Sequence, residues 1–232
     1  MLGLRAMGSR VEKETPLRRD ARRNREMLIA AAREIYTDQG VDAPLDDIAR
    51  RAGVGSATLY RRFAGRAELI EAVFGDSLRD ILRAAEEARS APDAWVGLTA
   101  YLERIFGLLA ADRGTNDLMT TGIQGVPSLD ALRKENHKTL DVLLRRAQQQ
   151  GAARKDTTAE DLLFLLAALG RAVPGSTVAA PLAWRRYLAL LLDGLRPEGS
   201  HPLPAPSLTG DQLGAAMLQL GKVRRPRMGR AD

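Results

Sequence analysis

The chain has 232 residues, a formal net charge of +6 and no cysteine. Hydrophobic residues make up 45% of it, enough for a buried core, whereas aromatic residues make up only 4%, which favours helices over a β-rich fold. The lack of cysteine excludes a disulfide scaffold, a thiolate metal site and a cysteine nucleophile. Because the two histidines, His137 and His201, lie far apart in the sequence, we expect no zinc site and no other cofactor.

The positive charge is concentrated near the N-terminus. Residues 1–66 hold 14 Lys and Arg against nine Asp and Glu, whereas residues 67–196 hold 16 against 17. Such a basic module is typical of proteins that bind polyanions such as DNA. The longest apolar run, residues 162–169, is too short to span a bilayer, and the basic N-terminus lacks the apolar segment of a signal peptide. We therefore expect a cytoplasmic protein with no membrane partner.

Hydrophobic periodicity predicts an all-α fold of about nine helices. Residues 1–19 are expected to form a flexible basic arm. Residues 197–232, rich in proline and then basic, are expected to form a disordered tail with at most a loose helix at Asp211–Leu220. Between the arm and the tail, helices are expected at about 20–39, 46–52, 56–63, 66–90, 93–111, 115–124, 128–150, 159–172 and 181–196.

Residues 45–63 have the helix–glycine turn–helix spacing of a DNA-reading motif. Apolar side chains on both short helices would hold them at a fixed angle: Ile48, Ala49, Val54, Leu59 and Phe63. Small residues at the start of the second helix, Ser56 and Ala57, would let it enter a major groove. The hydroxyls and arginines that follow suit phosphate oxygens: Thr58, Tyr60, Arg61 and Arg62. Arg66 adds a cation beside the N-terminus of the next helix, where backbone N–H groups already favour phosphate.

At these positions the chain resembles the TetR family of transcriptional regulators. The resemblance covers about residues 22–75 and rests on Asp47-Ile48-Ala49-x-x-Ala52-Gly53-Val54-x-x-x-Thr58-Leu59-Tyr60-x-x-Phe63, with Ala31-Ala32-Arg33-Glu34-Ile35-Tyr36-x-x-Gln39-Gly40 before it and Leu69-Ile70-Glu71-Ala72-Val73 after it. Two positions depart from the pattern. Leu45 stands where a capping Thr or Ser is common, and Gly55 replaces the usual Ser at the start of the recognition helix. Glycine is tolerated at that cap, at a cost of a few tenths of a kcal/mol.

The resemblance implies a three-helix DNA-binding head at residues 20–65. It also implies a helical body at residues 66–196 that receives an effector and dimerises through its last two long helices. Within the head it assigns base reading to Ser56 and Ala57. It assigns contacts with phosphate or flanking bases to Thr58, Tyr60, Arg61 and Arg62, and it places Arg66 where a phosphate-binding lysine usually opens the fourth helix.

The helix expected at 159–172 is apolar almost all round and therefore needs cover on every side. A second copy of the chain is the simplest cover, which predicts a homodimer through helices 159–172 and 181–196. Such a dimer would hold two recognition helices about 34–36 Å apart and bind a roughly palindromic double-stranded operator.

An effector pocket is expected among the helices of residues 66–150. The polar candidates for contacting an unknown small molecule are Arg104, Asp117, Met119 and His137, with Arg113 nearby in the sequence. For each of them a place on the surface or in the core is the simpler interpretation. These residues therefore define a hypothesis about the pocket rather than a motif.

These features predict a sequence-specific bacterial regulator, most simply a repressor that a small-molecule effector releases from its operator. The alternative is a DNA-binding regulator without a small ligand, which acts as an activator or through protein contacts; a solidly packed body would favour it. A helical scaffold that does not bind DNA would leave the basic head unexplained. An enzyme is not expected, because the sequence has no paired catalytic carboxylates placed by a motif, no glycine-rich phosphate loop and no His/Ser constellation.

Overall fold

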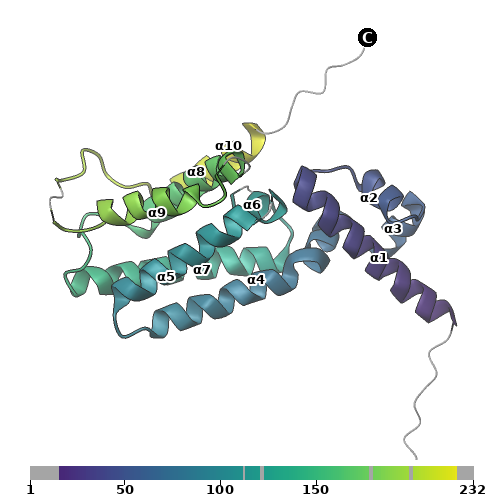
Figure 1. Ribbon diagram of the computed structural model, residues 1–232, viewed down its shortest axis with the longest axis horizontal. Helices are drawn as coiled ribbons and strands as arrows, with labels where there is room; N and C mark the ends of the chain where they lie inside the picture. Colours follow the sequence, from purple (N-terminus) through teal and green to yellow (C-terminus); the bar gives the residue numbers. More distant parts are fainter. Residues whose placement is uncertain (1–15, 112, 121–122, 178–179, 199–200, 224–232) are drawn as a thin grey trace, which may run out of the picture.

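The computed structural model describes residues 16–223 except 112, 121–122, 178–179 and 199–200. In that part of the chain it is all-helical, with ten helices and no strand (Figure 1). The helices are α1 (Pro16–Gln39), α2 (Leu45–Arg51), α3 (Ser56–Arg62), α4 (Arg66–Ser90), α5 (Ala94–Ala111), α6 (Arg113–Thr120), α7 (Pro127–Gln149), α8 (Ala159–Thr177), α9 (Ala183–Gly194) and α10 (Gly210–Val223). The all-α prediction is confirmed.

The head consists of α1, α2 and α3, which project from one end of an elongated body (Figure 1). Side chains from all three helices and the residue after α3 form its buried core: Leu28, Tyr36, Ile48, Leu59 and Phe63. Gly40 (φ 86°) ends α1 and Gly53 (φ 69°) forms the turn between α2 and α3. Both backbones are left-handed, a conformation that favours glycine. The helix-turn-helix that the spacing predicted is therefore present.

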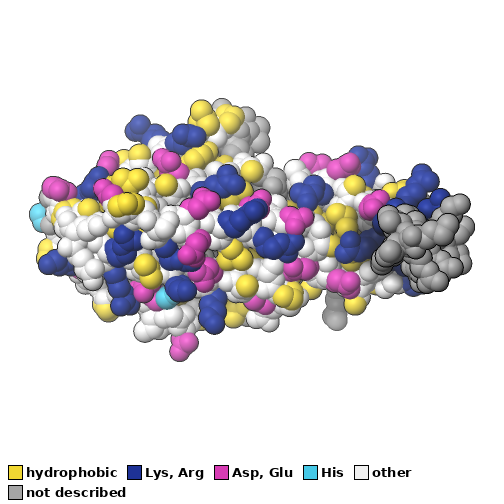
Figure 2. All heavy atoms as spheres, turned by 90° about the horizontal axis from the view of Figure 1, so that it is seen from below, with side chains coloured by type: hydrophobic (Ala, Val, Ile, Leu, Met, Phe, Trp, Pro, Cys, Tyr) yellow, Lys and Arg dark blue, Asp and Glu magenta, His cyan; other side chains and the backbone are white. Residues whose placement is uncertain are grey.

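The body is built on α4, α5 and α7, which pack against one another, with α8 and α9 packed on α5. Figure 1 shows α8, α9 and α10 along one side of this group. The short helix α6 lies at the end of the body that faces the head, where it contacts α1, α5 and α8. Charged side chains of both signs are interspersed over the face seen in Figure 2. The body thus has the mixed surface that its near-zero charge balance suggested.

One helix, α5, is long and apolar enough to cross a membrane when judged by length and composition alone. Its inner face, including Leu98, Leu102 and Phe106, is buried in the core of the body. A core helix passes the same test, so the feature is weak evidence for a membrane span.

The arm and the tail both differ from expectation. Helix α1 begins at Pro16, so residues 16–19 are helical; proline fits the first turn of a helix because its missing N–H would have no partner there. Residues 1–15, the rest of the expected arm, lie outside the described residues. Within the expected tail, residues 210–223 form α10, which covers the loose helix expected at Asp211–Leu220 and is slightly longer at both ends.

Helix α8 continues past the point where the sequence predicted its end. Pro174 has no N–H to give to the carbonyl of Gly170, one turn earlier, and a proline inside a helix usually leaves such a carbonyl without a partner. In the structure, the side chain of Asn116 on α6 donates from Nδ2 to the Gly170 carbonyl over 2.6 Å. A partner from another helix therefore satisfies the group that the proline leaves open, and α8 extends to Thr177.

Candidate DNA-binding face and effector pocket

The outward face of α3 carries the residues that the sequence assigned to DNA. Ser56, Ala57, Tyr60 and Arg61 are exposed, and Tyr60 is 55% exposed despite its large apolar ring. Their spacing of one and four residues places them on one side of a helix. Leu59, between them in sequence, is buried and fixes that side outward. The arrangement is a rigid ridge of small side chains, hydroxyls and a cation.

Contacts within the head orient parts of this ridge. The hydroxyl of Ser56 donates to Asp46 Oδ1 over 2.6 Å, which ties the start of α3 to α2. Arg61 Nη2 donates to Thr58 Oγ1 over 3.2 Å, so the two groups assigned to phosphate lie together. Arg62 is half-buried, and its buried Nε finds no hydrogen-bond partner among the described residues.

Arg66 has a structural role that the sequence did not indicate. Its Nη1 donates to the carbonyls of Val41, over 2.5 Å, and Ala43, over 2.6 Å. These bonds join the start of α4 to the loop between α1 and α2. Arg66 also lies beside Tyr36, whose pKa is raised to about 12 because burial disfavours the phenolate, an effect that the nearby guanidinium partly offsets. Arg66 is therefore a brace between head and body as well as a candidate phosphate contact.

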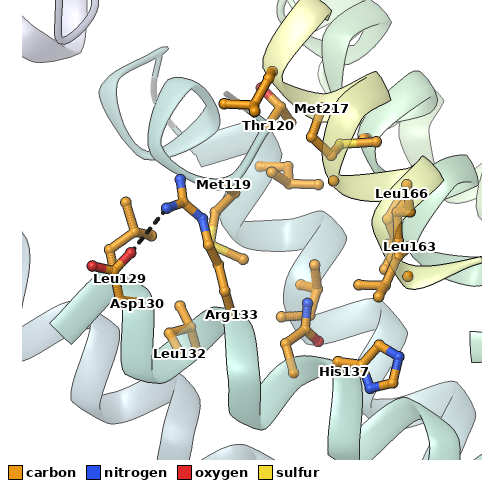
Figure 3. Close-up of a pocket in the computed structure, with 18 of the residues that line it drawn as sticks. Met119, Thr120, Leu129, Asp130, Leu132, Arg133, His137, Leu163, Leu166 and Met217 are labelled. Atoms are coloured by element: carbon orange, nitrogen blue, oxygen red, sulfur yellow. Dashed lines mark hydrogen bonds and ion pairs between the residues drawn. The ribbon is translucent and has the colours of Figure 1, made fainter. Parts of the chain in front are cut away.

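A pocket of about 470 Å³ lies in the body between α5, α6, α7, α8 and α10 (Figure 3). Most of its wall is apolar. Leu163 and Leu166 of α8 line one side, Met119 of α6 extends toward the centre, and Met217 of α10 approaches from near α8, across from the residues of α7 (Figure 3). Its size and lining are typical of a site for a small organic molecule.

Each titratable group that lines the pocket has a polar partner. On α7, Arg133 Nη1 lies 3.2 Å from Asp130 Oδ1, and burial lowers the pKa of this guanidinium. His137 Nε2, also on α7, lies 2.8 Å from Oε1 of Glu160 at the start of α8. The hydrogen bond from His137 holds the pKa of Glu160 below its usual value. The pocket wall thus has little unbalanced charge.

Two of the four effector candidates line this pocket and two do not. Met119 and His137 are part of its wall. Arg104 is exposed on α5 and is not in the wall, and Asp117 is buried against the head instead. Sequence reasoning missed Arg133 and Asn136, which line the pocket from α7. Arg133 stands four positions after Leu129, and Asn136 stands four positions from both Leu132 and Leu140 in the apolar stripe of α7. Polar residues within an apolar helical stripe were the available signal.

Helix α6 connects the pocket with the head. Met119 and Thr120, at its C-terminal end, line the pocket. At its N-terminal end Gly114 lies so close to α1 that a Cβ there would be 3.0 Å from the Tyr36 carbonyl oxygen and 2.9 Å from Phe74. A Cβ on Gly40 would likewise be 2.1 Å from Oδ2 of Asp117.

The same helix is fixed to α8. Asn116 Nδ2 donates to the Leu109 carbonyl over 3.0 Å as well as to Gly170, and a Cβ on Gly170 would be 2.8 Å from Cγ2 of Thr120. Close packing of this kind transmits small shifts because it leaves no free space to absorb them. Helix α6 is therefore held between the last turn of α1 and the middle of α8.

The fold and the exposed recognition helix define the chain as a helix-turn-helix DNA-binding regulator, and comparisons with known proteins identify its family. Residues 28–73 match the family model described as bacterial regulatory proteins, tetR family. Residues 91–197 match the model described as transcriptional regulator SbtR-like, C-terminal domain. A TetR regulator from Mycobacterium vanbaalenii is 31% identical, with 78% of this chain and 99% of that chain covered and a TM-score of 0.45.

The chain belongs to the TetR family of bacterial transcriptional regulators, a family of DNA-binding proteins rather than of enzymes. The transcriptional activator FasR of Mycolicibacterium smegmatis is 35% identical over 98 residues, which are 41% of this chain and 44% of that protein. The chain spans less than half the length of the curated relatives it matches. SmeT, the repressor of the Stenotrophomonas maltophilia multidrug efflux pump SmeDEF, shares the fold, with 22% identity, a TM-score of 0.53 and coverage of 78% of this chain and 97% of that chain.

Proposed function

We propose that this protein is a cytoplasmic, dimeric repressor that binds a palindromic operator through α3 and leaves it when a small molecule enters the pocket of the body. The observation that carries the proposal is the double contact of α6, which lines the pocket with Met119 and Thr120 and packs on α1 with Gly114 and Asp117. We further propose that residues 20–65 act as the DNA-binding domain and residues 66–196, extended by α10, as the effector domain.

The proposed DNA contacts on α3 are its exposed and half-buried residues, all of α3 except the buried Leu59. Ser56 and Ala57 would read base edges, and Thr58, Tyr60, Arg61 and Arg62 would contact phosphates or flanking bases. Arg66 would donate to a phosphate from the guanidinium nitrogens that are not bonded to the Val41 and Ala43 carbonyls. The support for this assignment is the outward direction of the ridge and the cation at its C-terminal end.

The coupling would run through α6. A ligand that binds better when α6 is displaced would weaken the packing of Gly114 and Asp117 on the last turn of α1 and so change the position of the head. Effectors typically alter affinity at a second site by about 1–3 kcal/mol, or 5–150-fold, which is enough to empty an operator.

The proposed dimer face is formed by α8 and α9, both of which leave large apolar side chains exposed. Phe164 on α8 is 41% exposed, and Tyr187 on α9 is 48% exposed. Leu165, next to Phe164, and Leu190, three residues after Tyr187, are also exposed. Neighbouring apolar side chains in such a patch mark an interface more often than an ordinary surface. Dimers are typical of the family.

The dimer proposal is tested by sedimentation of two matched variants. Phe164→Glu places a charge in the proposed interface and is expected to yield monomers at micromolar concentration. Val96→Glu changes an even more exposed apolar residue on α5, outside the face, and is expected to leave the dimer intact. If both variants sediment as the wild type does, the face is assigned wrongly.

An activator is the second candidate, because the FasR match covers 98 residues and FasR is an activator. Both roles need operator binding, so the direction of regulation is read from expression of the adjacent gene with and without the protein. Selection of bound genomic fragments supplies the operator for this measurement.

DNA binding is tested on the selected fragment by anisotropy at several salt concentrations. Arg61→Ala is expected to weaken binding and to lower the salt slope by about one, whereas Ser56→Ala is expected to alter preference among sequences. Arg145→Ala removes an exposed cation from α7, far from the head, and serves as the control. Equal affinities for Arg61→Ala and Arg145→Ala would contradict the assigned face.

A further inference from the structure

Helix α10 lies beyond the residues that the family models match, yet it covers the pocket. The match to the body ends at residue 197, and α10 begins at Gly210. Leu213, Gly214 and Met217 line the pocket on the side opposite α7, and Leu213 is buried there. Figure 3 shows Met217 extending from this helix toward the cavity. The chain thus supplies one wall of the pocket from outside the shared body.

Hydrogen bonds define where α10 begins. The amide of Thr209 donates to Gln212 Oε1 over 2.9 Å, and the amide of Gln212 donates back to Thr209 Oγ1 over 3.3 Å. This reciprocal pair is a capping box, which satisfies two amides at the start of a helix. The helix start is therefore specified by its own sequence rather than by the pocket alone.

The segment that leads to α10 is anchored at a second point. Arg154 and Asp156 form a two-bond ion pair, with N–O distances of 2.7 and 2.9 Å. Arg154 also donates to the carbonyl of His201, and Oδ2 of Asp156 accepts from the amide of Leu203 over 3.1 Å. The pair therefore ties down residues 201–203, six residues before the capping box. The length of free chain between the two anchors is short, which keeps α10 near the pocket.

The charges of the pocket wall restrict what it can hold. Asp130, Arg133 and His137 are the titratable side chains in the wall of the described pocket; Asp130 and Arg133 pair with each other, and His137 is hydrogen-bonded to Glu160. A charged ligand would have to compete with these existing partners or lie unpaired against the apolar part of the wall, and an unpaired charge there is costly. An uncharged ligand meets neither obstacle and gains from the leucine and methionine lining.

We propose that α10 is an integral wall of the effector site, that Leu213 and Met217 are specificity-determining ligand contacts, and that the site takes an uncharged, largely apolar molecule. This inference rests on the effector pocket proposed above. It extends that pocket to a helix outside the matched body, and it excludes organic anions and cations as preferred effectors.

The test uses the full-length protein and two fluorescent probes that differ by one charged group. N-phenyl-1-naphthylamine is uncharged, and 8-anilino-1-naphthalenesulfonate carries a sulfonate on the same skeleton. The wild type is expected to bind the uncharged probe at least tenfold more tightly. Equal or tighter binding of the sulfonate would overturn the assignment of an uncharged ligand.

Three variants test the role of α10. The double variant Leu213→Ala/Met217→Ala is expected to bind the uncharged probe roughly tenfold more weakly, because two apolar contacts are lost. Gly214→Leu is expected to weaken the same probe by filling the mouth of the pocket. An added Cβ at Gly214 meets nothing within 4 Å, and leucine favours a helix, so circular dichroism should show no loss of helix. Gln219→Ala, an exposed residue of the same helix, is the control and is expected to match the wild type.

A variant on α8 separates this inference from the proposed function. Leu163→Trp fills the pocket from α8. If Leu163→Trp loses the uncharged probe while the double variant and Gly214→Leu keep wild-type affinity, α10 is not part of the site, and the proposed function stands. If Leu163→Trp also keeps wild-type affinity, the pocket is not the site of binding, and the proposed function itself fails.

Discussion

The proposed DNA contacts in the head lie within eleven residues of sequence, Ser56 to Arg66, whereas the pocket in the body draws on five helices between Ile105 and Leu218. The head presents one exposed ridge on a small, fully packed scaffold. The body instead leaves a cavity among its helices. We infer from this difference that the head acts as a rigid unit and that α6, packed against both regions, links the pocket to it.

The first prediction distinguishes a residue of α3 that stabilises the head from a residue of α3 that is proposed to contact DNA. We expect its effect to be the largest of the four. Leu59→Ala removes a buried side chain from the head core and should lower the free energy of unfolding by about 2–5 kcal/mol. Tyr60→Ala, at the next position, removes an exposed ring and should change it by less than about 0.5 kcal/mol while weakening operator binding. Urea denaturation and DNA anisotropy measure the two effects. A large loss of stability in Tyr60→Ala would mean that Tyr60 supports the scaffold rather than contacts DNA.

The second prediction concerns the joint between head and body. Gly40→Ala combines a left-handed backbone with a Cβ that would displace Asp117, and we expect a loss of about 2–4 kcal/mol in the free energy of unfolding.

Gly53→Ala is the matched control for this joint. Its backbone is also left-handed, but a Cβ there meets nothing within 4 Å, so only the backbone strain of about 1 kcal/mol remains. Equal losses for the two variants would show that α6 does not press on α1, and would remove the physical basis of the proposed coupling.

The third prediction tests whether Arg66 stabilises the joint between head and body, contacts DNA, or does both. Arg66→Lys keeps the cation but loses the planar guanidinium that donates to Val41 and Ala43, and it should lower the free energy of unfolding by about 1 kcal/mol. If Arg66 also contacts phosphate, Arg66→Lys should retain the salt slope of DNA binding and Arg66→Gln should lower it by about one. If Arg66→Gln leaves the salt slope of DNA binding unchanged, Arg66 stabilises the loop and does not contact phosphate.

The fourth prediction has the smallest effect and concerns the anchor of α10. The hydrogen bond from Arg154 holds the pKa of Asp156 at about 2, below its ordinary 3.8, and the Leu203 amide assists. A depressed carboxylate pKa contributes stability that is present above the ordinary pKa and is lost as pH falls toward 2.

An NMR titration should therefore show the Leu203 amide resonance moving with a midpoint near pH 2. Asp156→Asn should abolish this titration without unfolding the body. A midpoint close to 3.8 would mean that the anchor of residues 201–203 does not persist in solution.

The sequence predicted the head almost completely because its determinants are local. The apolar positions of α2 and α3, the glycine turn at Gly53 and the exposed residues between them all follow from helical spacing over about 20 residues. Helix positions in the body were also predicted within a few residues for the same reason. The all-apolar character of α8 indicated an uncovered face, and the exposed Phe164 and Leu165 agree with that interpretation.

Tertiary structure alone decided three features of this protein. It gave Arg66 two backbone partners from a distant loop, and it carried α8 past Pro174 because Asn116 reaches the open carbonyl of Gly170. It also built the pocket, by placing α10 over a cavity whose first lining residue, Ile105, lies more than a hundred residues before it in the sequence. Each of these features depends on which helices pack against one another. Hydrophobic periodicity along one segment indicates only which face of that segment is buried, and it does not indicate which other helix covers that face.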